Sequence, residues 1–334
     1  MQYVEKIGYK SAANVRVKIE TIDTHPFHMH KDAIELIFVL RGCIDIWDCA
    51  ATYVLRKGAV HVFNRNDAHR ISRHVPEATD RETAGEENIV MTLHIDYNHY
   101  SDWFDKMRKA YFVTDTSDGT ESSASEMKYL RFLLARIARE YFGTCSALLL
   151  ENYTTELIGY LEEQFQDYFF YVTDAKHVAN IAWLQSTGQG FTPGGLQKDY
   201  DRVHRIADYM DEHYAAGIQL KTLARLEQVS EAYMSKYIRK NLGVTFSEYM
   251  SLIRCEEASK LLASTDQTVD QIAQSSGFSD RKELARNFSK WYHYKPSEYR
   301  KEIKKDLGAG AIVIADPVPY EAVSDSIDRW LDEY

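Results

Sequence analysis

A segment of about fifty residues occurs twice in the C-terminal part of this 334-residue chain, and this repeat restricts the fold more than any other feature. The first copy is LKTLARLEQVSEAYMSKYIRKNLGVTFSEYM, residues 220–250. The second is VDQIAQSSGFSDRKELARNFSKWYHYKPSEYR, residues 269–300. Their apolar positions align, and one residue is inserted at the start of the second helix of the second copy. The chain therefore uses one supersecondary unit twice.

Each copy predicts two short helices joined by a tight turn. Gln228 and Val229 fall at the turn in the first copy, and Gly277 falls there in the second. Ser230 and Ser279 follow the turns, where a helix N-cap is needed. The pattern is that of a double helix-turn-helix domain. A longer helix predicted over 246–264 would space the two second helices by about one turn of DNA, roughly 34 Å.

The second helix of each copy has an apolar face and a face rich in basic and small residues. Such a face can enter the major groove, where arginine and lysine pair with guanine. On one helix it would be ordinary solvated surface, but two matching copies favour DNA binding. The predicted base-contacting residues are Ala232, Tyr233, Ser235, Lys236, Arg239, Arg281, Lys282, Ala285 and Arg286. The predicted phosphate contacts are Lys240, Lys290, Lys295, Arg300 and Lys301.

Residues about 202–303 resemble the DNA-binding domain of the AraC/XylS family of bacterial transcription regulators. The second copy is similar to the family signature of IA, GF and P-x-x-[YF]-R, and it departs at His293, where glycine is common. The resemblance covers nearly a third of the chain. It implies a cytoplasmic, sequence-specific regulator that binds double-stranded DNA as a homodimer, with RNA polymerase as a further candidate partner. It does not carry over an operator sequence.

Residues 1–100 predict short strands. β-branched and aromatic runs at 15–22, 34–40, 43–49, 52–56, 59–63 and 88–95 are separated by turn residues. Strands at this spacing without intervening helices predict a small antiparallel sandwich or barrel. After them, helical periodicity over 126–142 and 147–165 predicts a helical hairpin whose apolar face is either internal core or a subunit seam.

The stretch HPFHMHKDAIELIFVLRG, residues 25–42, resembles the first motif of the cupin barrel, H-x-H-x4-E-x6-G, which AraC-type regulators use as a sensor. Residues 58–69 resemble the second motif more loosely, because Asn64 replaces its proline while His69 is kept. A metal cupin would use His28, His30, Glu35 and His69. Three imidazoles and a carboxylate suit iron, manganese, zinc or nickel.

Three interpretations of this motif compete. It is a sensor site for a small-molecule effector, or the centre of a metal-dependent cupin enzyme fused to a DNA-binding domain, or a set of histidines that satisfy one another. We favour the sensor, with no catalytic residue and no cofactor, and keep a divalent metal on the four residues above as the alternative. The predicted effector contacts are His28, His30, Glu35, Arg41, Trp47 and His69. An aromatic platform beside polar groups suits a sugar or related polyol.

The fold class is α+β and multidomain, with an N-terminal antiparallel cupin-like barrel, a helical hairpin and a C-terminal all-α double helix-turn-helix. The expected domains are the effector-binding barrel over 1–100, a helical dimerisation segment over 101–185, a Gly-rich linker over 186–200, the DNA-binding domain over 201–305 and an acidic tail of unknown role over 306–334. The tail should hold a strand-like run, a proline turn and a helix.

Composition agrees with this scheme. Residues 200–305 carry 18 lysines and arginines against 15 acidic residues, a net charge of about +3. Because the whole chain has a net charge of −10, the remaining residues carry about −13. The four cysteines have no metal-binding spacing, so reduced thiols in a cytosolic protein are expected. No signal peptide and no membrane span are predicted.

Overall fold

The computed structural model describes residues 5, 7–9, 14–48, 51–65, 67–75, 87–101, 111–112, 114, 124–167, 202, 205–206, 209–242, 245–308 and 313–333. The predicted linker over 186–200 lies outside these residues. The chain forms two compact units. Unit 1 comprises Met1–Asp167 together with Ile303–Tyr334, and unit 2 comprises Tyr168–Glu302.

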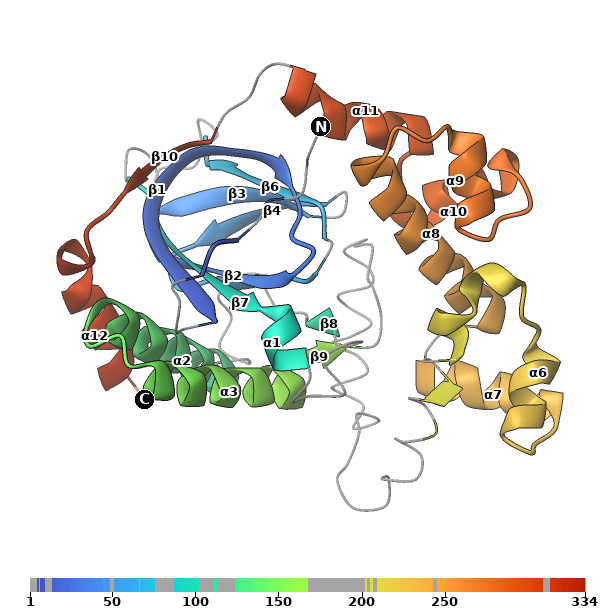
Figure 1. The fold of residues 1–334 in the computed structure, drawn as a ribbon, viewed down its shortest axis with the longest axis horizontal. Helices are drawn as coiled ribbons and strands as arrows, with labels where there is room; N and C mark the ends of the chain where they lie inside the picture. The colour runs from blue at the N-terminus through green and yellow to red at the C-terminus, as the bar shows by residue number, and fades with distance from the viewer. Residues whose placement is uncertain are drawn as a thin grey trace. The chain divides into compact units, whose positions relative to one another are not determined.

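Unit 1 contains one antiparallel sheet that curls into a nearly closed barrel (Figure 1), which confirms the predicted architecture. The strand order is β4-β3-β6-β1-β7-β2-β5, and β10 pairs with β1. The strands are β1 (Val15–His28), β2 (Ala33–Arg41), β3 (Cys43–Asp48), β4 (Ala51–Arg56), β5 (Val60–Phe63), β6 (His69–Arg73), β7 (Ile89–Asp96) and β10 (Ile314–Pro317).

Strand β2 is buried on both faces, because each face meets a different core. Ile37 and Val39 belong to an apolar cluster inside the barrel. Leu36 and Phe38 alternate with them and pack into a second core, which includes residues of helices α2 (Ala124–Phe142) and α3 (Ala147–Gln164). The helical hairpin is thus confirmed, and its buried apolar face is internal core against the barrel.

Smaller elements complete unit 1. Helix α1 (Tyr97–Ser101) follows β7, and the two-residue strands β8 (Tyr111–Phe112) and β9 (Gln166–Asp167) pair with each other. The C-terminal tail forms β10, the 3-10 turn η3 (Tyr320–Ala322) and helix α12 (Ser324–Asp332), as its sequence predicts. Among the described residues, no helix combines the length and apolar character needed to span a membrane.

Unit 2 is helical and contains the duplicated helix-turn-helix. After the 3-10 turn η2 (Tyr214–Ala216), the first copy forms α6 (Leu220–Leu226) and α7 (Glu231–Leu242), and the second forms α9 (Val269–Ser275) and α10 (Arg281–Tyr292). The predicted long helix between the copies is α8 (Phe246–Ser264). Helix α11 (Pro296–Gly308) follows α10 and ends in unit 1.

The turns of the two copies match the prediction, but one cap does not. Gln228 and Gly277 both have positive φ, at 54° and 82°. Ser230 caps α7, since its Oγ accepts the Tyr233 N–H at 3.2 Å. The prediction of Ser279 as the second cap is wrong: Asp280 is the N-cap of α10, and its Oδ1 accepts the Glu283 N–H at 2.7 Å. The residue inserted in the second copy moves the helix start by one position.

Candidate functional site

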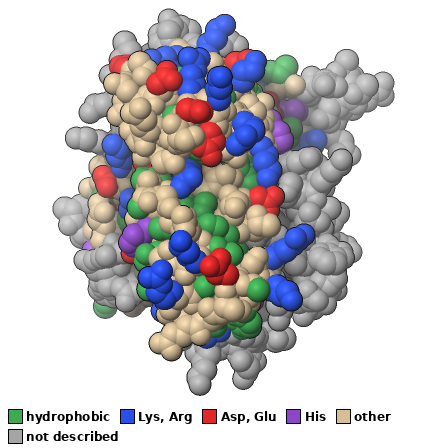
Figure 2. Space-filling view, turned by 90° about the vertical axis from the view of Figure 1, so that its right-hand side faces the viewer, with side chains coloured by type: hydrophobic (Ala, Val, Ile, Leu, Met, Phe, Trp, Pro, Cys, Tyr) green, Lys and Arg blue, Asp and Glu red, His purple; other side chains and the backbone are tan. Residues whose placement is uncertain are grey.

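The second helix of each helix-turn-helix buries one face and exposes the other. Met234 and Ile238 of α7 are fully buried, as are Leu284 and Phe288 of α10. The predicted base-contacting residues lie on the opposite faces, where all are exposed except the half-buried Ala285. Figure 2 shows lysine and arginine side chains spread over the face of the molecule that it views. The geometry leaves both basic faces open to a ligand.

Contacts from α8 fix the orientation of α10. The Trp291 indole N–H donates to Ser251 Oγ at 2.9 Å, and Lys290 Nζ lies 3.1 Å from a carboxylate oxygen of Glu248. Glu248 also closes a capping box with Thr245 at the start of α8, and these bonds with Lys290 lower its pKa to about 2. A recognition helix held in this way presents its outer face in a defined direction.

Arg300, predicted as a phosphate contact, has a structural role instead. Its guanidinium donates to the backbone carbonyls of Leu262 at 3.3 Å and Gln267 at 2.7 Å. These carbonyls lie at and beyond the end of α8, where the helix leaves its last carbonyls without helical partners. The P-x-x-[YF]-R ending of the signature therefore ties α11 to α8.

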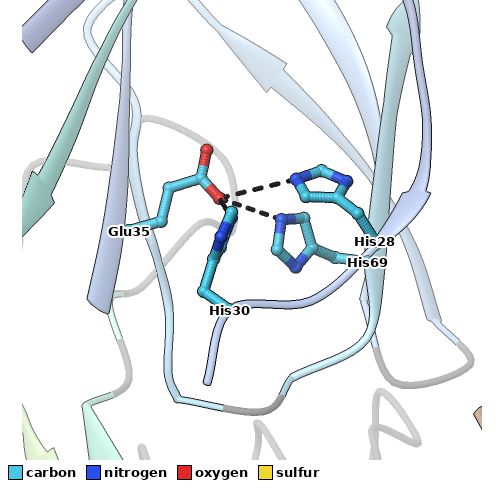
Figure 3. A group of neighbouring side chains, drawn as sticks. All are labelled: His28, His30, Glu35 and His69. Atoms are coloured by element: carbon cyan, nitrogen blue, oxygen red, sulfur yellow. Dashed lines mark hydrogen bonds and ion pairs between the residues drawn. The ribbon is translucent and has the colours of Figure 1, made fainter. Parts of the chain in front are cut away.

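Four polar side chains meet inside the barrel (Figure 3). His28 ends β1 and lies opposite His69, the first residue of β6, in the strand register. His30 follows β1, and Glu35 lies in β2 on the same face as the interior residue Ile37. All four residues are buried, so strands far apart in sequence build one enclosed site.

One carboxylate oxygen is the centre of this group. His30 Nε2 lies 2.8 Å from Glu35 Oε2, His69 Nε2 lies 2.9 Å from it, and His28 Nε2 lies 3.9 Å from it. The ring of Phe63 stacks on His69 with centroids 3.8 Å apart and an interplanar angle of 6°. We call His28, His30, Glu35 and His69 the His–Glu cluster.

The electrostatics of the cluster favour a charged Glu35 among mostly neutral histidines. Burial alone would raise the pKa of Glu35, but His30 and His94, with hydrogen bonds from His30 and His69, lower it well below its usual range. Burial opposes charge on His30, yet the neighbouring Glu35 raises its pKa. Burial and the surrounding imidazoles hold the pKa of His28 well below the ordinary histidine value.

His94 is a fifth member of this site that the sequence analysis did not identify. It lies in β7 directly opposite Glu35, is 2% exposed, and places Nε2 3.7 Å from Glu35 Oε1. Neither of its ring nitrogens has a hydrogen-bond partner, and burial lowers its pKa to about 3. The available signal was a histidine at an inward position of a buried strand.

The other two predicted effector contacts are not members of the cluster. Arg41 is exposed at the far end of β2, six residues beyond Glu35, which corresponds to about 20 Å along a strand. Its prediction as an effector contact beside the histidines is therefore not supported. Trp47 is buried in β3 and packs on Phe27 with ring centroids 5.0 Å apart, as a core residue does.

Asn64, which replaces the proline of the second motif, has a structural function. Its Nδ2 donates to the carbonyl of Phe112 at 3.0 Å, and its Oδ1 accepts the N–H of Phe112 at 2.7 Å. The backbone N–H of Asn64 donates to Asp67 at 2.9 Å. These bonds fix the segment that precedes His69.

Comparison with known proteins agrees with the duplicated fold. The sequence profile of a family described as "Helix-turn-helix domain" matches residues 223–302. An HTH-type transcriptional regulator of Staphylococcus aureus (strain MSSA476) is 23% identical over 287 residues, 85% of this chain and 33% of the relative. The HTH-type regulator YijO of Escherichia coli (strain K12) is 34% identical over 102 residues, 30% of this chain and 36% of YijO. The chain thus spans about a third of the length of these relatives.

Among solved structures, ToxT from Vibrio cholerae O395 is similar with a TM-score of 0.42 and 14% identity, over 87% of this chain and 98% of ToxT. The fold and the profile match define residues 223–302 as a helix-turn-helix domain. This match agrees with the AraC-type resemblance drawn from the signature of the second copy. The relatives that match most of the chain are HTH-type transcriptional regulators.

Proposed function

We propose that this protein is a sequence-specific transcriptional regulator that binds double-stranded DNA through α7 and α10 and is controlled by a small ligand in its barrel. The observation that carries the proposal is that α7 and α10 each bury an apolar face and expose a basic face. Arg281, Lys282 and Arg286 read bases from α10, and Ser235, Lys236 and Arg239 from α7. The proposal includes a cytoplasmic location and a homodimer, as the family resemblance implies.

Selection of bound sequences from a random DNA pool by the full chain tests this proposal. We expect an enriched motif with two elements about one helical turn apart, because two linked recognition helices enter successive major grooves. A variant with both Arg281→Ala and Lys236→Ala should not enrich the same motif. Recovery of DNA without any sequence preference would contradict the proposed function.

The effector site is the His–Glu cluster together with His94. Two nitrogens that face Glu35, His28 Nε2 and His94 Nε2, are buried without a hydrogen-bond partner. A buried polar atom without a partner costs about 1–3 kcal/mol, and a ligand that contacts it removes this cost. A polar ligand bound at the cluster would therefore gain binding free energy by pairing with these two nitrogens.

A divalent metal is the second candidate ligand, and the tautomer of His28 favours it. His28 Nδ1 lies 2.9 Å from the carbonyl of Pro26, and His69 Nδ1 lies 3.0 Å from the carbonyl of Asp67. The Pro26 carbonyl only accepts hydrogen bonds, so His28 Nδ1 carries a proton, and the Nε2 of a neutral His28, 3.9 Å from Glu35 Oε2, is left with its lone pair. His69 Nε2 donates to Glu35 Oε2 at 2.9 Å, so a metal bound at this nitrogen must displace that proton. Histidines that ligate metals are oriented by the same bond from the other ring nitrogen.

The donor spacing also fits a metal. Bonds of about 2.1 Å in tetrahedral geometry place adjacent donor atoms roughly 3.4 Å apart. The three imidazole nitrogens of the cluster lie 2.8, 2.9 and 3.9 Å from Glu35 Oε2. His28, His30, Glu35 and His69 would hold the ion, which would supply a positive charge; an ion that accepts five or six ligands would also have positions left for an effector.

Elemental analysis of the full chain purified without chelators separates the two candidates. A metal ligand predicts about one iron, manganese, zinc or nickel ion per chain, lost in His28→Ala and in His69→Ala. His74→Ala is the matched control, because His74 pairs with Asp45 outside the cluster. Metal-free protein that is stabilised by a sugar or polyol in a thermal-shift screen would favour the direct effector site.

A further inference from the structure

The C-terminal tail contacts two of the strands that carry the His–Glu cluster, β1 and β2. Strand β10 pairs with β1 from Glu20↔Pro317 to Thr24↔Ile314, and the Val318 N–H donates to the Ile19 carbonyl at 2.8 Å. The same β1 strand ends at His28. The last β1 residue that pairs with the tail, Thr24, is therefore four residues before His28 in the same strand.

The helix of the tail packs on the other face of β2. Trp330 of α12 lies 5.5 Å from the Phe38 ring, centroid to centroid, three residues after Glu35 in the same strand. Arg131 of α2 lies over the Trp330 ring at 5.2 Å and donates to the Gly58 carbonyl. Val323 and Ile327 are fully buried in the core shared by the barrel and α2. Figure 1 shows α12 beside α2.

This docking makes unit 2 an insertion within unit 1. The chain leaves unit 1 after Asp167 and returns to it at Ile303, within α11. Only positions 309–312 separate the end of α11 from the described tail. The DNA-binding unit is thus joined to the barrel by two covalent connections, and the second begins directly after the helix that follows α10.

We propose that the segment 313–333 is the output element of the barrel: it transmits the state of the His–Glu cluster from β1 and β2 to the second helix-turn-helix through α11. The proposal rests on the proposed function, since it concerns the same cluster and the same DNA-binding unit. A ligand that draws His28 and Glu35 together shifts β1 relative to β2, and the tail is anchored to both strands. Coupling requires such an element with different contacts in two states.

A covalent break at the connection distinguishes transmission from simple stabilisation. A protease site inserted at positions 309–312 allows the purified full chain to be cut while the tail stays docked, which co-elution of the two fragments verifies. Glu35→Gln serves as the change at the cluster, with His30→Gln as a second variant in case the first fails to fold. The readout is the dissociation constant for a DNA sequence selected by the uncut chain.

We expect Glu35→Gln to change this dissociation constant at least about fivefold in the uncut chain and less than about twofold after the cut. Arg329→Ala, on the exposed part of α12, is the control and should alter neither result.

An equal effect of Glu35→Gln before and after the cut would overturn the proposal, and so would a cluster variant that folds yet has no effect in the uncut chain. Failure of the uncut chain to bind any selected DNA is a different result, because it would contradict the proposed function itself.

Discussion

His69 and Glu35 are 34 residues apart in the chain, yet His69 Nε2 lies 2.9 Å from Glu35 Oε2 inside the barrel. The imidazole is fixed on its other side by the Asp67 carbonyl and across its face by Phe63. A side chain held by bonds on two sides is preorganised for a ligand. This pair links the two motifs of the barrel into one site, and the predictions below follow from that site, the recognition helices and the tail.

Replacing Arg281 or Arg286 by alanine should weaken binding to the selected DNA by about 1–3 kcal/mol and relax base preference at one position. Both arginines are exposed on the outer face of α10, away from its buried Leu284. Fluorescence anisotropy with the selected sequence and its single-base variants measures both effects. Arg329→Ala removes the same charge outside unit 2 and should leave affinity unchanged; if it weakens binding equally, the contact is non-specific.

Unit 1 should lose stability as the pH falls through the range set by its buried histidines. Burial lowers the pKa of His94 from 6.5 to about 3, so its contribution is complete above about pH 6.5 and is lost toward pH 3. His30, whose pKa is raised, acts in the opposite direction and loses its contribution as the pH rises above 6.5. Glu35, whose pKa is lowered, loses its contribution only below about pH 4.

A His94→Leu variant isolates the histidine contribution to this pH dependence. Between pH 6.5 and 5 the wild-type chain should lose about 1 kcal/mol more unfolding free energy than the variant, measured by urea unfolding at each pH. Identical pH profiles would show that His94 is not kept neutral by burial.

The tail should stabilise the barrel. Ile327→Ala removes a fully buried side chain from the core shared with α2, which should cost about 2–4 kcal/mol of the unfolding free energy of unit 1. Calorimetry should show a lower transition temperature for unit 1 and no change for unit 2. Asp328→Ala, an exposed neighbour on α12, should have no such effect. Equal behaviour of the two variants would mean that α12 is not docked.

His293 should tolerate glycine with a gain. It ends α10 in the left-handed region with φ 55°, a conformation that costs a residue with a Cβ about 1 kcal/mol. His293→Gly is therefore expected to raise the unfolding free energy of unit 2 by about 0.5 kcal/mol, while His293→Ala should give no gain. Chemical denaturation of the three proteins compares them directly.

Much of the fold follows from local patterns in the sequence. Alternating and β-branched runs identify the strands from β1 to β5 and β7, because one or both faces of each must be buried. Strand β6 was missed: His69–Arg73 is short and polar at alternate positions, and its pairing with β1 and β3 comes from tertiary contacts. The position of the tail on β1 and α2 was not predictable for the same reason.

The site was predicted where a motif fixes the spacing and missed where it does not. His28, His30 and Glu35 lie within one turn-and-strand segment, so their proximity is a local property. His94 comes from another strand, and only the β2–β7 register brings it opposite Glu35. Arg41 shows the converse: it is close to Glu35 in sequence, but an extended strand separates them in space.

The ratio of two dissociation constants, for the selected DNA sequence and for a scrambled sequence of equal length and composition at the same salt concentration, tests the central claim most directly. A protein that reads bases with α7 and α10 should bind the selected sequence at least about a thousandfold more tightly. A ratio near one, with binding that depends only on salt, would contradict the assignment of this chain as a sequence-specific regulator.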